Sequence, residues 1–189
     1  MKKLIIAFLF LSFSTQGFPQ FFKDSKTVTK HEGYVTFYYD ESTDKIFLQI
    51  ENLQQEFLYV NSLSEGVGSN DIGLDRGQLG NTRIVKFMKA GNKLLLIQPN
   101  QDYRAITDNL EEKKSVEQAF AKSVIHGFVI KETNQGKYLV DATSFFMRDA
   151  HGVQVRLSVR KQGSYSLDKS RSAINLERTK AFPKNVEFD

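Results

Sequence analysis

The stretch GSNDIGLDRGQLG, from Gly68 to Gly80, places two carboxylates in a glycine-rich loop and is the first candidate for chemistry. Asp71 and Asp75 could ligate calcium, because this cation prefers carboxylate oxygens. A helix–loop–helix calcium site also needs glycine sixth and glutamate twelfth, whereas counting from Asp71 gives an arginine and a threonine. The Gly-Lys-Ser/Thr string of a phosphate-binding loop is missing as well. We therefore interpret the stretch as a structural or interdomain loop whose aspartates cap turns and pair with Arg76.

The three histidines are the next candidates, because two or three imidazoles converging on one point could hold a catalytic zinc ion. His31, His126 and His151 are far apart in the sequence, and H-E-x-x-H does not occur. His126 ends a predicted helix, where the helix dipole favours a histidine. Because Arg148 and Asp149 precede His151, we expect His151 in a turn, satisfied by the neighbouring carboxylate.

Nucleophilic and acid–base catalysis find no support in the sequence. There is no G-x-S-x-G, and the S-x-x-K string at 166–169 lacks the companion motifs of the serine enzymes that use it. The adjacent carboxylates Glu111 and Glu112 lie on the exposed side of a predicted helix. We therefore expect no catalytic residue, metal or cofactor in this chain.

Composition and charge limit the classes of protein to which this chain can belong. The chain has 189 residues, 40% of them hydrophobic, enough for one domain with its own core. It has no cysteine, which excludes disulfides, thiol catalysis and iron–sulfur clusters. The formal charge is +4, and basic residues gather in the last third: Arg156, Arg160, Lys161, Lys169, Arg171, Arg178, Lys180 and Lys184. Without a nucleic-acid-binding module, this cluster favours docking to an acidic neighbour rather than nucleic acid.

The first residues have the layout of an export signal. Lys2 and Lys3 precede an apolar run from Leu4 to Leu11, followed by small and polar residues up to position 17. The run is too short to span a bilayer, and no cysteine follows it to carry a lipid. We predict a signal peptide over 1–17, a periplasmic or secreted location, no transmembrane segment after its removal, and a loose polar lead-in over 18–32.

Strand patterns dominate the rest of the chain, which we treat as one β-rich domain over 33–189. Segments rich in aromatic and β-branched residues are separated by turn residues, which is typical of β-hairpins. We predict strands at 33–40, 45–50, 56–61, 82–89, 94–99, 128–132 and 137–143. A strand or short helix is expected at 143–149, and extended segments are expected at 153–159 and 172–178.

One helix is predicted, over about 108–126. Asp108 is the expected N-cap, with a glutamate three residues later. Val116, Phe120 and Val124 recur every four residues and form one apolar stripe. Antiparallel hairpins with one inserted amphipathic helix predict a β-dominated α+β fold.

Three long segments together resemble a known family: 57–80, 140–153 and 163–188, with 94–105 and the predicted helix in the same order. The family is the N-terminal domain of unknown function that precedes the catalytic domain in large secreted bacterial zinc-dependent metalloproteases. The resemblance implies that zinc and its H-E-x-x-H helix belong to a catalytic domain absent from this chain. The chain therefore resembles a truncated version, with an export signal and an accessory domain but without the catalytic domain.

Three functional hypotheses remain open. The first is a non-catalytic accessory domain that packs against, or assists, a protease domain in cis or in trans. Its candidate contact or loop residues are Asp71, Asp75, Arg76, Arg148, Asp149, His151, Arg171 and Arg178. The second is a free-standing module that binds a peptide or glycan on aromatic strand residues: Tyr34, Phe37, Tyr38 and Tyr39. The third is a fragment without a function of its own, whose last strand is unpaired and leaves an exposed sheet edge.

Overall fold

The computed structural model describes residues 18, 20–22, 26–68 and 70–189. The predicted signal peptide at 1–17 therefore lies outside the described residues. The strands are β1 (Val28–His31), β2 (Thr36–Asp40), β3 (Lys45–Ile50), β4 (Phe57–Tyr59), β5 (Arg83–Ala90), β6 (Lys93–Gln98), β7 (Ser123–Asn134), β8 (Lys137–Asp141), β9 (Lys180–Ala181) and β10 (Val186–Glu187). The helices are α1 (Leu110–Ala119), α2 (Thr143–Phe146) and α3 (Val153–Val159), with 3-10 turns η1 (Asn70–Ile72) and η2 (Lys169–Arg171).

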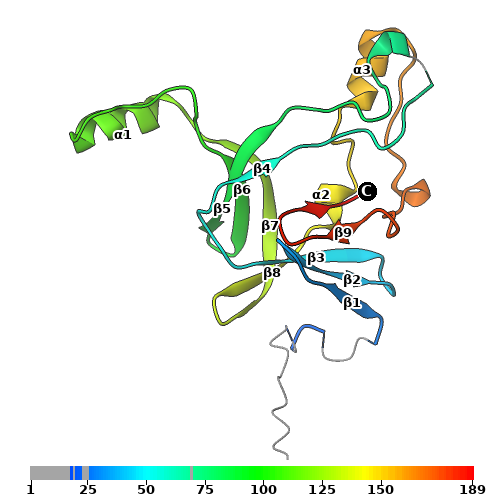
Figure 1. The fold of residues 1–189 in the computed structure, drawn as a ribbon, viewed down its shortest axis with the longest axis horizontal. Coiled ribbons are helices and arrows are strands. Elements are labelled where there is room, and N and C mark those ends of the chain that lie inside the picture. The colour runs from blue at the N-terminus through cyan, green and yellow to red at the C-terminus, as the bar shows by residue number, and fades with distance from the viewer. Residues whose placement is uncertain (1–17, 19, 23–25, 69) are drawn as a thin grey trace, which may run out of the picture.

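Eight strands form one curled antiparallel sheet in the order β1-β2-β3-β8-β7-β6-β5-β4 (Figure 1). The three predicted hairpins are confirmed as β2–β3, β5–β6 and β7–β8, each joining neighbours in sequence and in space. Pairing of β3 with β8 joins the first three strands to the other five. The fold is therefore β-dominated, as predicted, with little helix.

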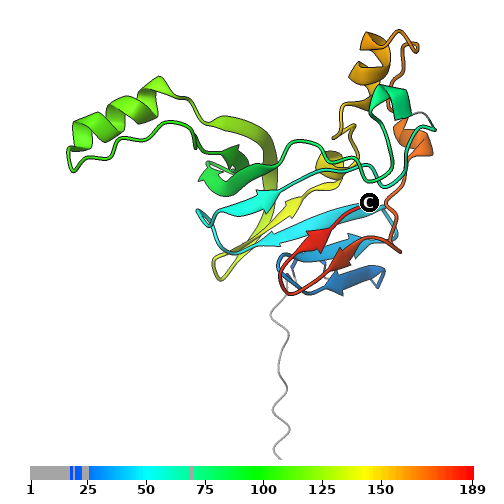
Figure 2. The same ribbon diagram turned by 45° about the horizontal axis from the view of Figure 1, so that its top comes forward.

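The core lies on one face of the curled sheet, because side chains alternate between faces along a strand. Phe37 of β2 is fully buried there, and Phe145 of α2 packs into the same cluster. The C-terminal hairpin β9–β10 covers the β1–β3 part of this face (Figure 2). Phe188 stacks on Phe146 with ring centroids 3.9 Å apart and contacts Phe37 at 5.1 Å. The expected unpaired final strand is wrong for β10, which pairs with β9.

The opposite face carries a second apolar cluster, and it corrects the expectation of a loose lead-in over 18–32. Tyr38 and Phe47 point to this face, where Phe18 is only 2% exposed and Phe22 packs on both rings. Residues 28–31 form β1, which pairs with β2. The lead-in is structured in its described part because it covers aromatic side chains that would otherwise face water.

The predicted helix is shorter than expected. Helix α1 ends at Ala119, and its N-cap is Asn109, whose side chain accepts from the Glu111 amide at 2.9 Å. The placement of Asp108 as the cap is therefore wrong. Val124 and His126 belong to β7, because residues 123–129 pair with β6 and exchange helical for inter-strand hydrogen bonds. His126 is consequently not a helix-end residue.

The two extended segments predicted in the C-terminal third have different outcomes. Residues 153–159 form helix α3 instead of an extended segment, because both oxygens of the Asp149 carboxylate accept from the free first-turn amides of Val153 and Gln154, each at 2.9 Å. Residues 172–178 contain no strand: Ser172 has an extended backbone, whereas 176–178 form a turn. Alternating apolar residues misled the prediction for 153–159, since the backbone there forms a helix instead of pairing with a strand.

Candidate functional site

The glycine loop at 68–80 contacts α3 through one of its backbone carbonyl groups. The Arg156 guanidinium of α3 donates to the Gly73 carbonyl, and Ser62 bridges Leu79 across the base of the loop. Leu74 at its centre is fully buried. These contacts support a structural reading, because a buried leucine anchors the loop to the rest of the domain.

The charged residues of the loop do not form the expected pairs. Asp71 and Arg76 are exposed, and Asp75 is half-buried. Across the described part of the chain, Arg76 forms no ion pair with either aspartate. The predicted pairing is therefore wrong, and the loop depends on backbone contacts and Leu74 instead.

His151 lies near the same loop but does not contact a carboxylate, contrary to the sequence expectation. Its Nδ1 accepts from the Asn61 side-chain amide at 3.1 Å, since Asp149 is engaged with the start of α3. Burial, with a smaller contribution from the positive charge of Arg156, lowers the pKa of His151. A neutral ring is consistent with Nδ1 acting as an acceptor. The buried Nε2 has no partner among the described residues.

The remaining candidate residues do not converge on one place. Arg171 contacts Asp168 at 2.8 Å on the surface. Arg178 contacts Asp189 at 3.4 Å and Glu65 at 3.8 Å, so it ties the C-terminal segment to the loop region. Such exposed pairs contribute little to stability. Among the predicted residues, Arg148 lines a sizeable cavity.

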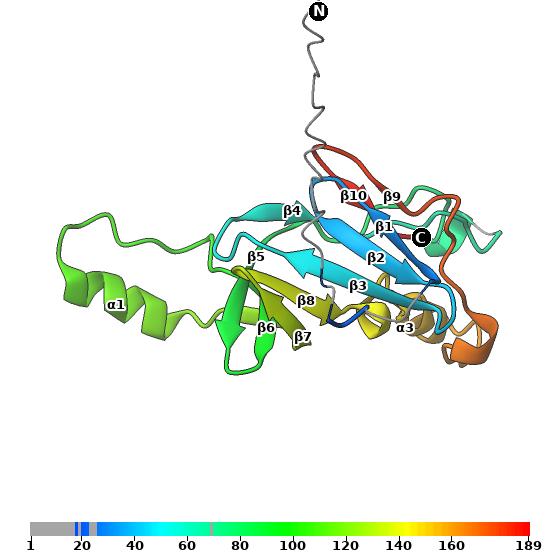
Figure 3. The same cartoon turned by 90° about the horizontal axis from the view of Figure 1, so that it is seen from below.

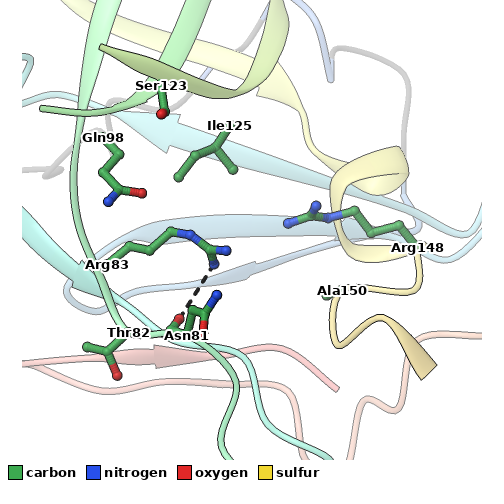
Figure 4. Close-up of a pocket in the computed structure, with 8 residues that line it drawn as sticks. All are labelled: Asn81, Thr82, Arg83, Gln98, Ser123, Ile125, Arg148 and Ala150. Carbon is green, nitrogen blue, oxygen red and sulfur yellow. Dashed lines mark hydrogen bonds between the residues drawn. The ribbon is translucent and has the colours of Figure 1, made fainter. Parts of the chain in front are cut away.

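That cavity has a volume of about 650 Å³ and is lined mainly by polar side chains (Figure 4). We call it the arginine pocket; its lining residues are Asn81, Thr82, Arg83, Gln98, Ser123, Ile125, Arg148 and Ala150. Figure 4 shows the guanidinium groups of Arg83 and Arg148 pointing into the same space from opposite sides. The pocket therefore presents two positive charges to one volume.

Strand alternation explains why polar groups line this volume. Arg83 precedes the buried core residue Val85 by two positions, so the two side chains point to the same face of β5. Gln98 likewise follows Leu96 by two positions on β6 and pairs with Ser123 of β7. The pocket is thus the polar continuation of the apolar core at one end of the sheet.

A β-bulge shapes the wall contributed by β7. The register between β6 and β7 shifts between Leu96 and Ile97, which leaves Ile125 as the extra residue of β7. A bulge bends its strand and redirects the side chain of the extra residue. Here the extra residue is one that lines the pocket and packs against the core.

Arg148 is fixed in place by three contacts. Its Nε donates to the Phe145 carbonyl at 2.8 Å, and its Nη2 donates to the Tyr59 hydroxyl at 2.9 Å. The guanidinium also lies 4.3 Å from the centre of the Phe145 ring, a cation–π arrangement. The turn after α2 therefore delivers a preorganised positive charge to the pocket.

The positive charges of the pocket are not neutralised within the described part of the chain, where neither Arg83 nor Arg148 has an acidic partner. Arg83 makes one long hydrogen bond, from Nη1 to the Asn81 carbonyl at 3.5 Å. Burial, and then the charge of Arg148, lowers the pKa of nearby His126. The pocket is therefore chemically suited to hold an anion.

Sequence reasoning identified Arg148 but missed Arg83, Gln98 and Ser123. Arg83 could have been found from the alternation of side chains along the strand, because it lies on the same face as the core residues Val85 and Phe87. A cation on the buried side of a strand needs a partner or a function. Ser123 carried no such signal, since it was assigned to the helix.

Metal sites and membrane-spanning helices are two further kinds of feature to consider. Across the described ranges, no three histidine, aspartate or glutamate side chains gather closely enough to hold a metal ion. Within the same residues, no helix has the length and apolarity needed to cross a bilayer.

Comparison with known proteins places two family segments on this fold. Residues 16–66 match the domain of unknown function DUF5118, and residues 77–189 match the domain of unknown function DUF5117. No curated protein and no solved structure matches the chain. The first match contains β1–β4 and the second contains β5–β10, so the sheet is built from both. Since the second match covers more than half of the sequence, the chain belongs to the DUF5117 family.

Proposed function

We propose that this chain is a non-catalytic accessory domain of an exported zinc-dependent metalloprotease-like protein, and that it packs against or assists a protease domain absent from this chain. The resemblance of three long segments to such N-terminal domains supports the proposal. Zinc would then be bound by the catalytic domain, which acts in cis or in trans. This chain would contribute binding surface and no reacting group.

The proposed docking role is supported by an arm that projects from the sheet. The arm comprises residues 99–122, which connect β6 to β7 and contain α1 (Figures 1 and 3). Ile106 is 99% exposed and Leu110 is 75% exposed. Helix α1 contains no buried residue among those described. Apolar side chains held away from the core are a common feature of surfaces that another protein covers.

The arm has defined local structure at its base. Tyr103 stacks on Phe120 with ring centroids 3.9 Å apart and planes only 5° from parallel. The Asn100 side chain accepts from the backbone amides of Asp102 and Tyr103 at 3.0 and 3.2 Å. These contacts limit the entropy lost when the exposed apolar residues are covered by a partner domain.

The aromatic platform of the rival binding-module hypothesis is not available on the surface. Phe37 is fully buried and Tyr38 is 4% exposed, and the Tyr38 hydroxyl donates to Gln49 at 2.8 Å. Tyr39 is half-buried, which leaves Tyr34 as the one exposed member of the four. Three of the four aromatics pack in or against the two apolar clusters, so the arm is the better candidate for a contact surface.

Co-purification tests the accessory role. The DNA downstream of the Asp189 codon is first read for an open frame that encodes H-E-x-x-H. The tagged chain is then co-expressed with the product of that frame, and we expect the two to elute together. The isolated chain should cleave no casein, with or without added zinc. Zinc-dependent cleavage by the isolated chain that is abolished in His151→Ala would contradict a non-catalytic role.

A further inference from the structure

We propose that the arginine pocket binds a carboxylate group presented by a peptide, either an acidic side chain or a free C-terminus. Arg83 and Arg148 would contact the carboxylate directly. No lining residue belongs to the arm, although Gln98 and Ser123 directly adjoin its two ends, and the inference does not depend on a protease domain docking on the arm.

The first argument is electrostatic. Two guanidinium groups point into one volume, and the lining residues include no acid to offset them. Like charges brought together at a partly buried site repel each other more strongly than in water. A bound anion would convert this repulsion into two favourable charge-assisted interactions.

The second argument is the preorganisation of Arg148. Nε and Nη2 are engaged by Phe145 and Tyr59, whereas Nη1 has no hydrogen-bond partner among the described residues. A guanidinium fixed by two bonds loses little further entropy when its free N–H groups meet a carboxylate. Packing over the Phe145 ring maintains the plane of the group. The residue is thus held in place for a ligand instead of a neighbouring side chain.

The third argument concerns the rest of the ligand. A volume of about 650 Å³ is far larger than a single carboxylate needs and lies within the range of small-molecule and short-peptide sites. Asn81 and Gln98 supply amides that both donate and accept, as peptide groups do, and Ser123 adds a hydroxyl. Ile125 provides an apolar wall. This lining fits a peptide segment better than an isolated inorganic ion.

The ligand panel separates the sources of the carboxylate. It consists of acetyl-Ala-Ala-Glu-amide, acetyl-Ala-Ala-Ala with a free C-terminus, the neutral acetyl-Ala-Ala-Gln-amide and inorganic phosphate, each titrated into the full chain by calorimetry and by NMR. We expect saturable binding of at least one of the first two peptides and none of the glutamine peptide. Whichever carboxylate binds identifies the source.

The variant pair tests the location of the site. Arg83→Gln removes one charge from the pocket and disturbs only the long bond to Asn81, so the fold should survive. We expect it to weaken carboxylate binding by about tenfold or more. Arg160→Gln makes the same charge change on an exposed residue of the region after α3, outside the lining, and should bind like the parent chain.

Several results would overturn the inference. They are the absence of binding by both carboxylate peptides, equal binding of the glutamine peptide, binding of phosphate alone, and an Arg83→Gln affinity equal to that of Arg160→Gln. Thermal melting of both variants confirms that the folded protein is titrated. Docking of the protease domain depends on the arm, so a failure of either experiment leaves the other informative.

Discussion

The guanidinium of Arg148 donates to the hydroxyl of Tyr59 at 2.9 Å across 89 residues of sequence. Tyr59 is also the cross-strand neighbour of Arg83 in the β4–β5 pair, so one tyrosine is placed next to both arginines of the pocket. Tyr59 belongs to the DUF5118 segment, whereas Arg83 and Arg148 belong to the DUF5117 segment. The pocket is therefore organised by contacts between the two family segments.

Tyr59→Phe should reduce both stability and carboxylate binding, because it removes the acceptor that positions Arg148 and leaves the aromatic ring in place. We expect the free energy of unfolding to fall by about 1.5–3 kcal/mol, as for a hydrogen bond to a charged group. Urea denaturation measures the change. Tyr165→Phe is the control, since the Tyr165 hydroxyl bonds only the nearby Gln162 carbonyl at the surface. Equal stability of the two variants would contradict a structural role for the Tyr59–Arg148 contact.

The two family segments should depend on each other for folding. Pairing of β3 with β8 and of β4 with β5 crosses from one segment to the other, so each segment alone would leave open sheet edges and an uncovered core. Residues 18–76 and 77–189 expressed separately should give poorly dispersed amide NMR spectra, and co-expression should restore dispersion. Independent folding of both pieces would show that they are separate domains.

Leu74→Ala should be strongly destabilising if the glycine loop is structural. Leu74 is fully buried, and removing such a side chain costs about 2–4 kcal/mol of unfolding free energy. Leu58→Ala on β4 is the matched control, because Leu58 is 65% exposed and should cost much less. Chemical denaturation compares them. A loss for Leu74→Ala no greater than that of the control would contradict the proposed anchoring role.

Acidification should weaken the fold through His151. Its folded pKa is lowered from 6.5 by burial, so the unfolded chain binds a proton at a higher pH than the folded chain. The stabilising effect of the neutral ring is present above the unfolded value and is lost as pH falls below 6.5. His31 and His126 shift in the same direction and add to the loss. Urea midpoints at several pH values between 7.5 and 5 would measure this loss.

The matched variant for this effect is His151→Gln, which cannot titrate and can still accept from Asn61. We expect its stability to depend less steeply on pH than that of the parent chain, with the remaining slope due to the other two histidines. The same slope in both proteins would show that His151 does not contribute to the pH dependence.

Hairpins were predictable from the sequence because their information is local. Ala90 and Lys93 flank a turn in which Gly91 has a positive φ of 58°, as Gly-Asn turns favour. The alternation of apolar and polar residues identified both strands. The helix was harder to delimit. Val124 fits the helical period, but its place in β7 depends on pairing with Ile97, which no local pattern reveals.

The candidate site was only partly predictable for the same reason. Arg148 was selected from its neighbours Asp149 and His151, yet its hydrogen-bond partner Tyr59 and the other pocket arginine, Arg83, lie far away in sequence. The pairing of all the strands determines which strands adjoin β4 and β5. It also determines where the turn after α2 lies. The pocket therefore becomes visible only when the strand order is known.

The most direct test of the accessory role is calorimetric titration of the purified chain with the purified product of a downstream frame that encodes H-E-x-x-H. The account predicts saturable binding that is lost when the arm carries Ile106→Ser and Leu110→Ser together, and retained in Val159→Ser, a comparably exposed site on α3. Absence of binding by the parent chain, or equal binding by the arm variant, would contradict docking through the arm.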